Sequence, residues 1–120
     1  MPADQYHEPP GELSQAVRTF ARVVASLQEE AEAIGWYEQR ISLEKDAQAK
    51  AIMEDAQQEE FKHFAMALEF LSRRKPKLHV VLKEVLFKKG DIVKHGEAGE
   101  KAEALTKSKP GRRASARKAG

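Results

Sequence analysis

The chain has no cysteine, which excludes disulfides, thiolate metal ligands and a cysteine nucleophile. This absence fits a reducing compartment, and we expect a cytoplasmic protein. Long apolar runs are also missing, since none approaches the roughly 18 to 20 residues that a membrane-spanning helix needs. The first residues, Met1-Pro2-Ala3-Asp4, lack the basic and apolar stretches of a signal peptide. The sequence therefore predicts a protein that is neither exported by a signal peptide nor inserted in a membrane.

Glycine and proline are scarce before residue 90 and β-branched residues are sparse, whereas Ala, Glu, Lys, Leu and Gln dominate. This composition is typical of helices. A chain of 120 residues forms one domain at most. We therefore expect an all-α fold with a small core.

The charge of the chain is unevenly distributed. Residues 101–120 hold seven Lys or Arg and one acid, Glu103, so this segment carries +6 and, with a net charge of +2, the remainder carries −4. Such a segment can hold nucleic acid or an acidic surface by counterion release, but short basic termini are more often solvated or targeting segments. Residues 91–120 are also poor in hydrophobic residues. We expect a disordered basic tail over these residues, and not a nucleic-acid-binding protein.

Apolar residues recur from residue 13 at alternating steps of four and three, the pattern of a helix that packs along another helix. We call these positions the seam; they are Leu13, Val17, Phe20, Val24, Leu27, Ala31 and Ile34. The first helix should run from about Glu12 to Ile41, after an extended arm over residues 1–11 that ends in Pro9-Pro10-Gly11.

Residues 42–46 are the best place for a tight reversal, with Asp46 as the N-cap of a second helix. The second helix has the same alternation and should end before Pro76; its seam residues are Ala49, Met53, Ala56, Glu60, His63, Ala67 and Phe70. A short third helix over residues 78–86 is stopped by Gly90. The sequence predicts an antiparallel two-helix hairpin with a short third helix over residues 12–90.

Two seam positions of the second helix hold ionisable residues where Met or Leu would be expected. Glu60 and His63 are three residues apart and so lie on one face of a helix, close enough to bind one metal ion. On the first helix, Glu30 is one step from seam residue Ala31, and in a hairpin that turns near residue 44 it lies at the level of Glu60. Because an unpaired buried carboxylate is costly, this seam needs a partner of opposite charge.

Two interpretations of these residues stay open at this point. In one, Arg40 or Lys62 and water satisfy the Glu60–His63 pair, which is then structural. In the other the residues bind iron. A helix-bundle di-iron site takes one Glu from each of two helices and a Glu-x-x-His from each of two others, and this chain has half of that set. Two copies would supply two Glu30, two Glu60 and two His63, so the site would exist only between subunits.

Two runs of the sequence carry a resemblance. They are Glu29-Glu30-Ala31-Glu32-Ala33-Ile34-Gly35-Trp36-Tyr37-Glu38-Gln39-Arg40 and Glu59-Glu60 with His63, Met66, Leu68-Glu69, Leu71 and Arg73-Arg74. Together they resemble the encapsulated ferritins, the two-helix iron-oxidising cargo of encapsulin nanocompartments, over roughly residues 6–93. Such a protein would complete its four-helix-bundle di-iron sites by oligomerisation.

The resemblance implies a ferroxidase that oxidises Fe(II) with dioxygen at a di-iron centre between two subunits of an annular decamer. Glu30, Glu60 and His63 match the iron ligands of the family. Glu29 and Glu32 match carboxylates proposed to attract or bind iron on its way in. Other divalent metals, such as Ca or Zn, are expected to substitute for iron in preparations.

The resemblance also places Trp36 and Tyr37 beside the centre, where Tyr37 is the candidate for a catalytic redox role, although such aromatics are often plain interface residues. It implies an encapsulin shell as the partner and the site of iron storage. Cargo of this kind usually ends in a targeting peptide of the Leu-Thr-Val-Gly-Ser-Leu-Arg-Arg type. In the basic tail only Leu105-Thr106 and Arg112-Arg113 echo that peptide.

A protein of another class is compatible with the same residues. It is a non-enzymatic helical adaptor that dimerises through its seam and binds a shell protein or nucleic acid through its basic tail. That interpretation predicts that Glu60 and His63 can be replaced by Leu with a gain in stability and no loss of activity. A rubrerythrin-like peroxidase is disfavoured, because the chain has no cysteine pairs for a second iron site.

Overall fold

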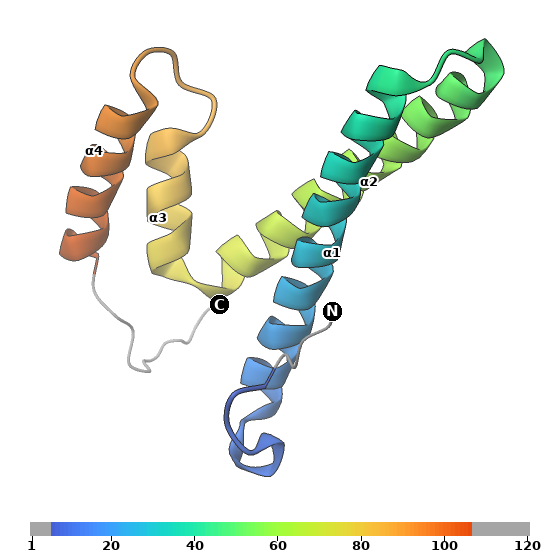
Figure 1. The fold of residues 1–120 in the computed structure, drawn as a ribbon. Helices are drawn as coiled ribbons and strands as arrows, with labels where there is room; N and C mark the ends of the chain where they lie inside the picture. Colours follow the sequence, from blue (N-terminus) through green and yellow to red (C-terminus); the bar gives the residue numbers. More distant parts are fainter. Residues whose placement is uncertain (1–5, 107–120) are drawn as a thin grey trace. The chain divides into compact units, whose positions relative to one another are not determined.

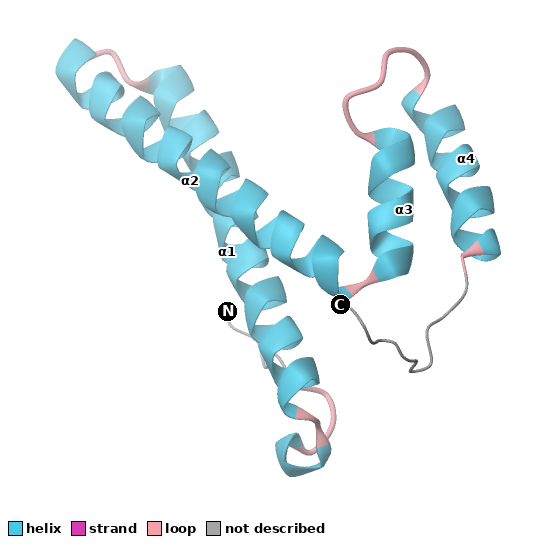
Figure 2. Cartoon of the chain, turned by 180° about the vertical axis from the view of Figure 1, so that it is seen from behind, coloured by secondary structure: helices cyan, strands magenta, loops and turns pink. Residues whose placement is uncertain are grey.

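The computed structural model describes residues 6–106, and all regular structure in that range is helical (Figure 1, Figure 2). A short 3-10 helix, Pro10–Glu12, precedes α1 (Gln15–Leu43), α2 (Ala47–Arg74), α3 (Pro76–Val85) and α4 (Ile92–Leu105). The described residues divide into two compact units, the first ending at Leu71 and the second beginning at Ser72. Within the described range, no helix has the length and apolar character needed to cross a membrane. The all-α prediction is confirmed, and a fourth helix joins the three that were expected.

Helix α1 begins at Gln15, later than expected, because Ser14 caps it. The Ser14 hydroxyl accepts a hydrogen bond from the Val17 amide at 3.1 Å, which satisfies one of the free N–H groups of the first turn. Just before it, the Pro10 carbonyl accepts a hydrogen bond from Nη1 of Arg18 at 3.1 Å. The end of the arm is thus a 3-10 turn tied to α1, where the sequence suggested an extended segment.

Residues 44–46 reverse the chain, as predicted. Oδ1 of Asp46 accepts a hydrogen bond from the Ala49 amide at 2.9 Å, so Asp46 is the N-cap of α2. Within the turn, Oε2 of Glu44 accepts from the Asp46 amide at 3.0 Å. Helix α2 ends at Arg74, ahead of Pro76. The two long helices lie side by side and antiparallel, which is the predicted hairpin (Figure 1, Figure 2).

The inward face of α1 differs from the predicted seam in its detail. Glu30 and Tyr37 are partly buried, whereas Ala31 is exposed and Val17 is 50% exposed. The reason is that 3.6 residues per turn do not match a seven-residue repeat, so the buried line of a straight helix drifts by about 20° per heptad. Glu30 therefore lies in the contact face itself, where the sequence placed it one step away.

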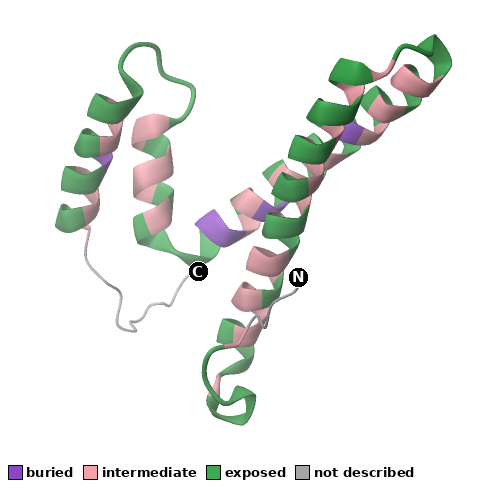
Figure 3. Cartoon of the chain, viewed as in Figure 1, coloured by how far each residue is buried: buried purple, intermediate pink, exposed green. Residues whose placement is uncertain are grey.

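The hairpin buries little of its own surface. Among the described residues of the first unit, the buried ones are Gln57, Ala67 and Leu71, all on α2 (Figure 3). Large apolar side chains remain exposed: Ile52 is 67% exposed, Met66 61%, Trp36 50% and Phe61 49%. One copy of the hairpin thus leaves a considerable apolar area for another surface to cover.

In the second unit, α3 and α4 pack against each other as a shorter helical pair. Gly99 is buried at their contact, where a Cβ atom would lie 3.4 Å from the Cα and carbonyl oxygen of Val81. Nζ of Lys77 lies 3.2 Å from Oε2 of Glu103, which joins the start of α3 to the end of α4. Ahead of α3, Oγ of the buried Ser72 lies 3.1 Å from Nδ1 of His79.

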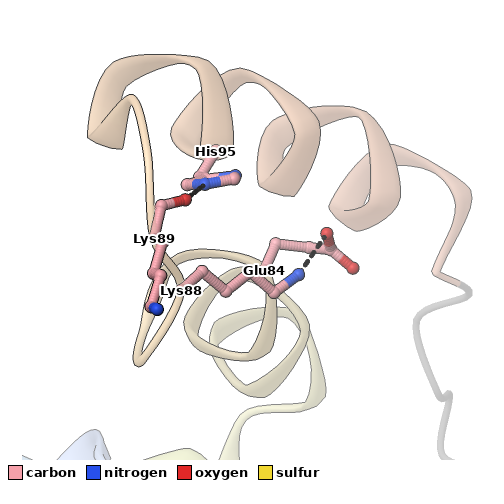
Figure 4. A network of polar contacts seen from close by, with 4 residues as sticks. All are labelled: Glu84, Lys88, Lys89 and His95. Atoms are coloured by element: carbon pink, nitrogen blue, oxygen red, sulfur yellow. Dashed lines mark hydrogen bonds and ion pairs between the residues drawn. The ribbon is translucent and has the colours of Figure 1, made fainter.

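The turn between α3 and α4 is held by polar contacts (Figure 4). Nε2 of His95 donates a hydrogen bond to the Lys89 carbonyl at 2.7 Å, and Nζ of Lys88 lies 3.2 Å from Oε1 of Glu84. Between them, Phe87 has a φ of +63° and a fully exposed side chain. The turn thus has a defined conformation with two residues at positive φ, Phe87 and Gly90, whose φ is +99°.

Residues 92–105 were expected to be disordered, and they form α4 instead. Asp91 caps this helix, since its Oδ1 accepts a hydrogen bond from the Lys94 amide at 3.1 Å. The hydrophobic content of the sequence does not predict such a helix, because α4 packs on α3 through the close approach of its backbone at Gly99 and does not need large apolar side chains there. The rest of the expected tail, with Arg112-Arg113, lies outside the described residues.

Candidate metal centre

Glu30 lies in the contact face of α1 with one carboxylate oxygen buried and unpartnered. Its Oε1 accepts no hydrogen bond from the part of the chain that the structure describes. Burial raises the pKa of this carboxyl above its ordinary value; His63 opposes the shift, and the negative charges of Glu60 and Glu29 add to it. A desolvated carboxylate of this kind is stabilised by a nearby cation. Glu30 therefore presents a buried carboxylate oxygen that is available to a cation.

The side chains of Glu60 and His63 extend from α2 without a hydrogen bond between them. Nδ1 of His63 is 3.8 Å from Oε1 of Glu60, too far for a hydrogen bond, and the two side chains are 45% and 26% exposed respectively. The prediction that both occupy the seam is correct for Glu60 and wrong for His63, which is exposed while the next residue, Phe64, is partly buried. The same drift of the buried line explains this difference. His63 thus lies at the exposed edge of the contact face.

The three residues selected from the sequence come together on one hairpin. His63 and Glu60 are close enough to Glu30 for their charges to act on its pKa. Within residues 6–106 of one chain, no group of three or more His, Asp or Glu side chains is arranged to hold a metal ion. A single copy brings these ligand types to one level of the hairpin.

The two cations that the structural interpretation assigned to this pair have other partners. Nζ of Lys62 lies 2.9 Å from Oε1 of Glu59, and the hydrogen bond from Lys62 lowers the pKa of that carboxyl. The guanidinium of Arg40 lies over the Tyr37 ring, 5.2 Å from its centroid. Neither contact satisfies the carboxylate of Glu60.

The remaining predicted residues lie on α1 around this region. Glu29 and Glu32 are both exposed to solvent. Trp36 is half exposed and lines an open hollow at the surface, whereas Tyr37 is partly buried. Their roles, in attracting iron and in flanking a centre, stay predictions.

One buried polar residue of the hairpin was not predicted from the sequence. Gln57 is 9% exposed, and its Nε2 donates hydrogen bonds to the Ile34 carbonyl at 3.2 Å and to Oε1 of Glu38 at 2.9 Å. Its spacing was a signal, because a residue three before Glu60 shares the face of α2 that Glu60 occupies. The signal is masked by Ala56, which fits the apolar alternation and makes its neighbour look like a surface residue.

Residues 5–89 match a protein-family model described as EncFtn-like. A ferritin-like protein of Thermotoga maritima is 46% identical over 85 residues, which cover 71% of this chain and 75% of that protein. An encapsulated ferritin-like protein of Rhodospirillum rubrum is 33% identical over 108 residues, covering 83% of this chain and 77% of that protein.

A solved structure is similar in fold as well as in sequence. The crystal structure of protein ne0167 from Nitrosomonas europaea aligns with a TM-score of 0.71 and 42% identity, covering 74% of this chain and 98% of that chain. All the candidate ligands lie inside the segment that the family model matches, whereas α4 begins beyond its end.

Proposed function

Because the chain belongs to the EncFtn-like family of encapsulated ferritins, we propose that it is a ferroxidase, which oxidises Fe(II) to Fe(III) with dioxygen. The observation that carries the proposal is the buried, unpartnered Oε1 of Glu30, close to the charges of Glu60 and His63. Carboxylate and imidazole groups together suit iron. Iron is the substrate of this reaction.

The proposed centre lies between two copies of the chain. A helix-bundle di-iron site takes one Glu from each of two helices and a Glu-x-x-His from each of two others, and one hairpin supplies half of that set. A second copy would add another Glu30, Glu60 and His63. The exposed Ile52 and Met66 support self-association, because they leave apolar surface that a second copy can cover. A ring of five such dimers is the assembly that the family resemblance implies.

Two Fe(II) ions at such a centre supply the two electrons that convert dioxygen and two protons into hydrogen peroxide. The carboxylates of Glu30 and Glu60 hold the ions and stabilise the extra positive charge of the Fe(III) products. Glu29 and Glu32, both exposed, attract Fe(II) toward the hairpin. Tyr37 and Trp36 flank the centre, and Tyr37 is the candidate for a redox role there.

Iron storage is proposed to take place inside an encapsulin shell. The relative from Rhodospirillum rubrum is named as an encapsulated protein, and this supports the same setting here. Production of the chain together with an encapsulin shell protein tests the setting: the chain should elute with the assembled shell. Elution as a free oligomer only would contradict it.

The proposed activity is tested by adding Fe(II) without oxygen, admitting air, and following ferric absorbance together with native mass. The wild type should oxidise iron rapidly and gain mass as an oligomer, while Glu60→Ala should do neither. Glu59→Ala is the matched control, because Glu59 is the exposed neighbour paired with Lys62. If the wild type and Glu60→Ala both oxidise iron at the slow rate of iron in buffer, the carboxylates are structural and the adaptor interpretation replaces the ferroxidase.

A further inference from the structure

The side-chain amide of Gln57 joins the two long helices. Its Nε2 donates one hydrogen bond to the backbone carbonyl of Ile34 at 3.2 Å and one to Oε1 of Glu38 at 2.9 Å, so both amide protons point to α1. Gln57 is also the one buried polar side chain among residues 6–71. A buried amide is most stable in the alignment that supplies both acceptors, and here the side-chain acceptor, Glu38, is the one specific to a single alignment.

Apolar packing defines the alignment of this hairpin less sharply. Several inward positions of α2 hold small residues, namely Ala49, Ala56 and Ala67. Alanine side chains interdigitate little with a facing helix, so they resist a shift of one helical turn, about 5.4 Å, less than large side chains do. For Gln57 the same shift exchanges the Ile34 carbonyl for another backbone carbonyl of α1 but removes the Glu38 carboxylate, which leaves one buried donor unsatisfied. A single buried polar residue sets the register of paired helices in the same way in coiled coils.

The alignment set by this amide is the one that brings the candidate ligands together. Since α1 and α2 are antiparallel, one turn back along α1 from Ile34 leads to Glu30, and one turn forward along α2 from Gln57 leads to Glu60. We propose that Gln57 is a positioning residue, which holds α1 and α2 in the register that keeps Glu30 and Glu60 at one level. Its importance for iron oxidation rests on the proposed function, whereas the register itself does not.

The first test replaces the amide by an apolar group of similar size, Gln57→Leu. The variant should fold with an unchanged or raised melting temperature, because the leucine buries apolar area at this site. Iron oxidation should fall by about tenfold, since a displacement of about 1 Å in a catalytic arrangement is enough for such a loss. Gln58→Leu is the matched control on the exposed side of α2 and should stay within about twofold of the wild type.

A second measurement reads the register directly. The chain has no native cysteine, so spin labels can be attached at Gln28→Cys on α1 and Ala65→Cys on α2, both exposed positions. Labelled copies are diluted with unlabelled ones so that only distances within one hairpin are measured. The wild type should give one narrow distance distribution, and adding Gln57→Leu should broaden it or shift it by about one turn, roughly 5 Å.

An exchange of the two partners separates positioning from general packing. Gln57→Glu alone places two carboxylates opposite each other and should broaden the distance distribution and lower the oxidation rate. Gln57→Glu with Glu38→Gln restores one amide and one carboxylate between the helices at unchanged net charge. The exchanged pair should recover the narrow distribution and most of the lost rate, which a role in packing alone would not produce.

Anaerobic titration with Co(II), followed by its visible absorption, gives a metal-binding readout that does not need turnover. Weaker Co(II) binding by Gln57→Leu than by Gln58→Leu is expected. Equal Co(II) binding, equal oxidation and an unchanged distance distribution in the two variants would overturn the positioning role and leave the ferroxidase intact. If the wild type itself oxidises no iron, the proposed function is wrong. The distance measurement then still tests whether Gln57 sets the register of the two helices. Gln57→Met takes the place of the leucine variant should that variant not fold.

Discussion

Lys62 is paired with Glu59 and not with Glu60, since its Nζ lies 2.9 Å from Oε1 of Glu59. Glu60 is instead 3.8 Å from Nδ1 of His63. Two adjacent carboxylates of α2 therefore have different surroundings. Glu59 is exposed, and the hydrogen bond from Lys62 lowers its pKa, whereas Glu60 lies partly buried in the contact face. This difference makes the exposed pair a natural control for the candidate ligands.

Lys62→Ala should leave iron oxidation at the wild-type level, because Lys62 serves the exposed carboxylate of Glu59. The lowered pKa of Glu59 means that the pair stabilises the fold above the ordinary value of 4.5 and that this contribution is lost as the pH falls through the lowered pKa. Since Glu59 is exposed to solvent, the effect should be small and should vanish in high salt. Melting temperatures at pH about 7 and about 3, each in low and high salt, check this. A large loss of iron oxidation would contradict it.

Glu30→Gln should raise the melting temperature of the metal-free protein at neutral pH and abolish rapid iron oxidation. Burial raises the pKa of Glu30, so the folded state holds its proton more tightly than the unfolded state, and this stabilisation, present below the ordinary value of 4.5, is lost as the pH rises through the raised pKa. The glutamine amide of the variant carries no charge, so the variant does not lose this stability as the pH rises. Calorimetry without metal and with Co(II) is the measurement, and Co(II) should stabilise the wild type alone. A lower melting temperature for the metal-free variant would contradict the conclusion that the Glu30 carboxylate destabilises the metal-free fold.

Gly99→Leu should destabilise the packing of α4 on α3 by about 1 to 3 kcal/mol, the usual cost of overfilling a close contact. A Cβ at Gly99 would already lie 3.4 Å from the backbone of Val81. Gly96→Leu is the control on the same helix, since no atom lies within 4 Å of a Cβ there, and it should be neutral or stabilising. Hydrogen exchange of the α4 amides distinguishes them. Equal protection in both variants would show that the close approach at Gly99 is unimportant.

Phe87→Asn should stabilise the turn between α3 and α4 by up to about 1 kcal/mol. Phe87 has a φ of +63° and an exposed side chain, so the change relieves a left-handed conformation that asparagine tolerates better, and little packing is lost. Leu86→Asn is the comparison, because Leu86 has a φ of −77° and is only 38% exposed, and it should be destabilising. Urea unfolding measures both. Destabilisation by Phe87→Asn would mean that the aromatic side chain has a partner in the assembled protein.

The hairpin was predictable because its signals are local. The seam alternation, the reversal near residue 44 and the cap at Asp46 follow from the 3.6-residue period and from the hydrogen-bonding needs of a helix end. The proximity of Glu30 and Glu60 was predictable as well, since residues equidistant from a tight turn face each other. Helix α4 was not, because its packing depends on a glycine contact with α3 that hydrophobic content does not register.

By itself, the sequence determined the first three helices, the turn that joins the long pair and the set of ionisable residues at one level, because each depends on spacing along the chain. The tertiary structure alone decided which of those residues are buried. It left His63 at the exposed edge, buried Oε1 of Glu30 without a hydrogen-bond partner among residues 6–106, and buried the amide of Gln57 between the helices. The physical reason is that burial depends on the azimuth of each residue once two helices are in contact, and a drift of 20° per heptad is enough to change it.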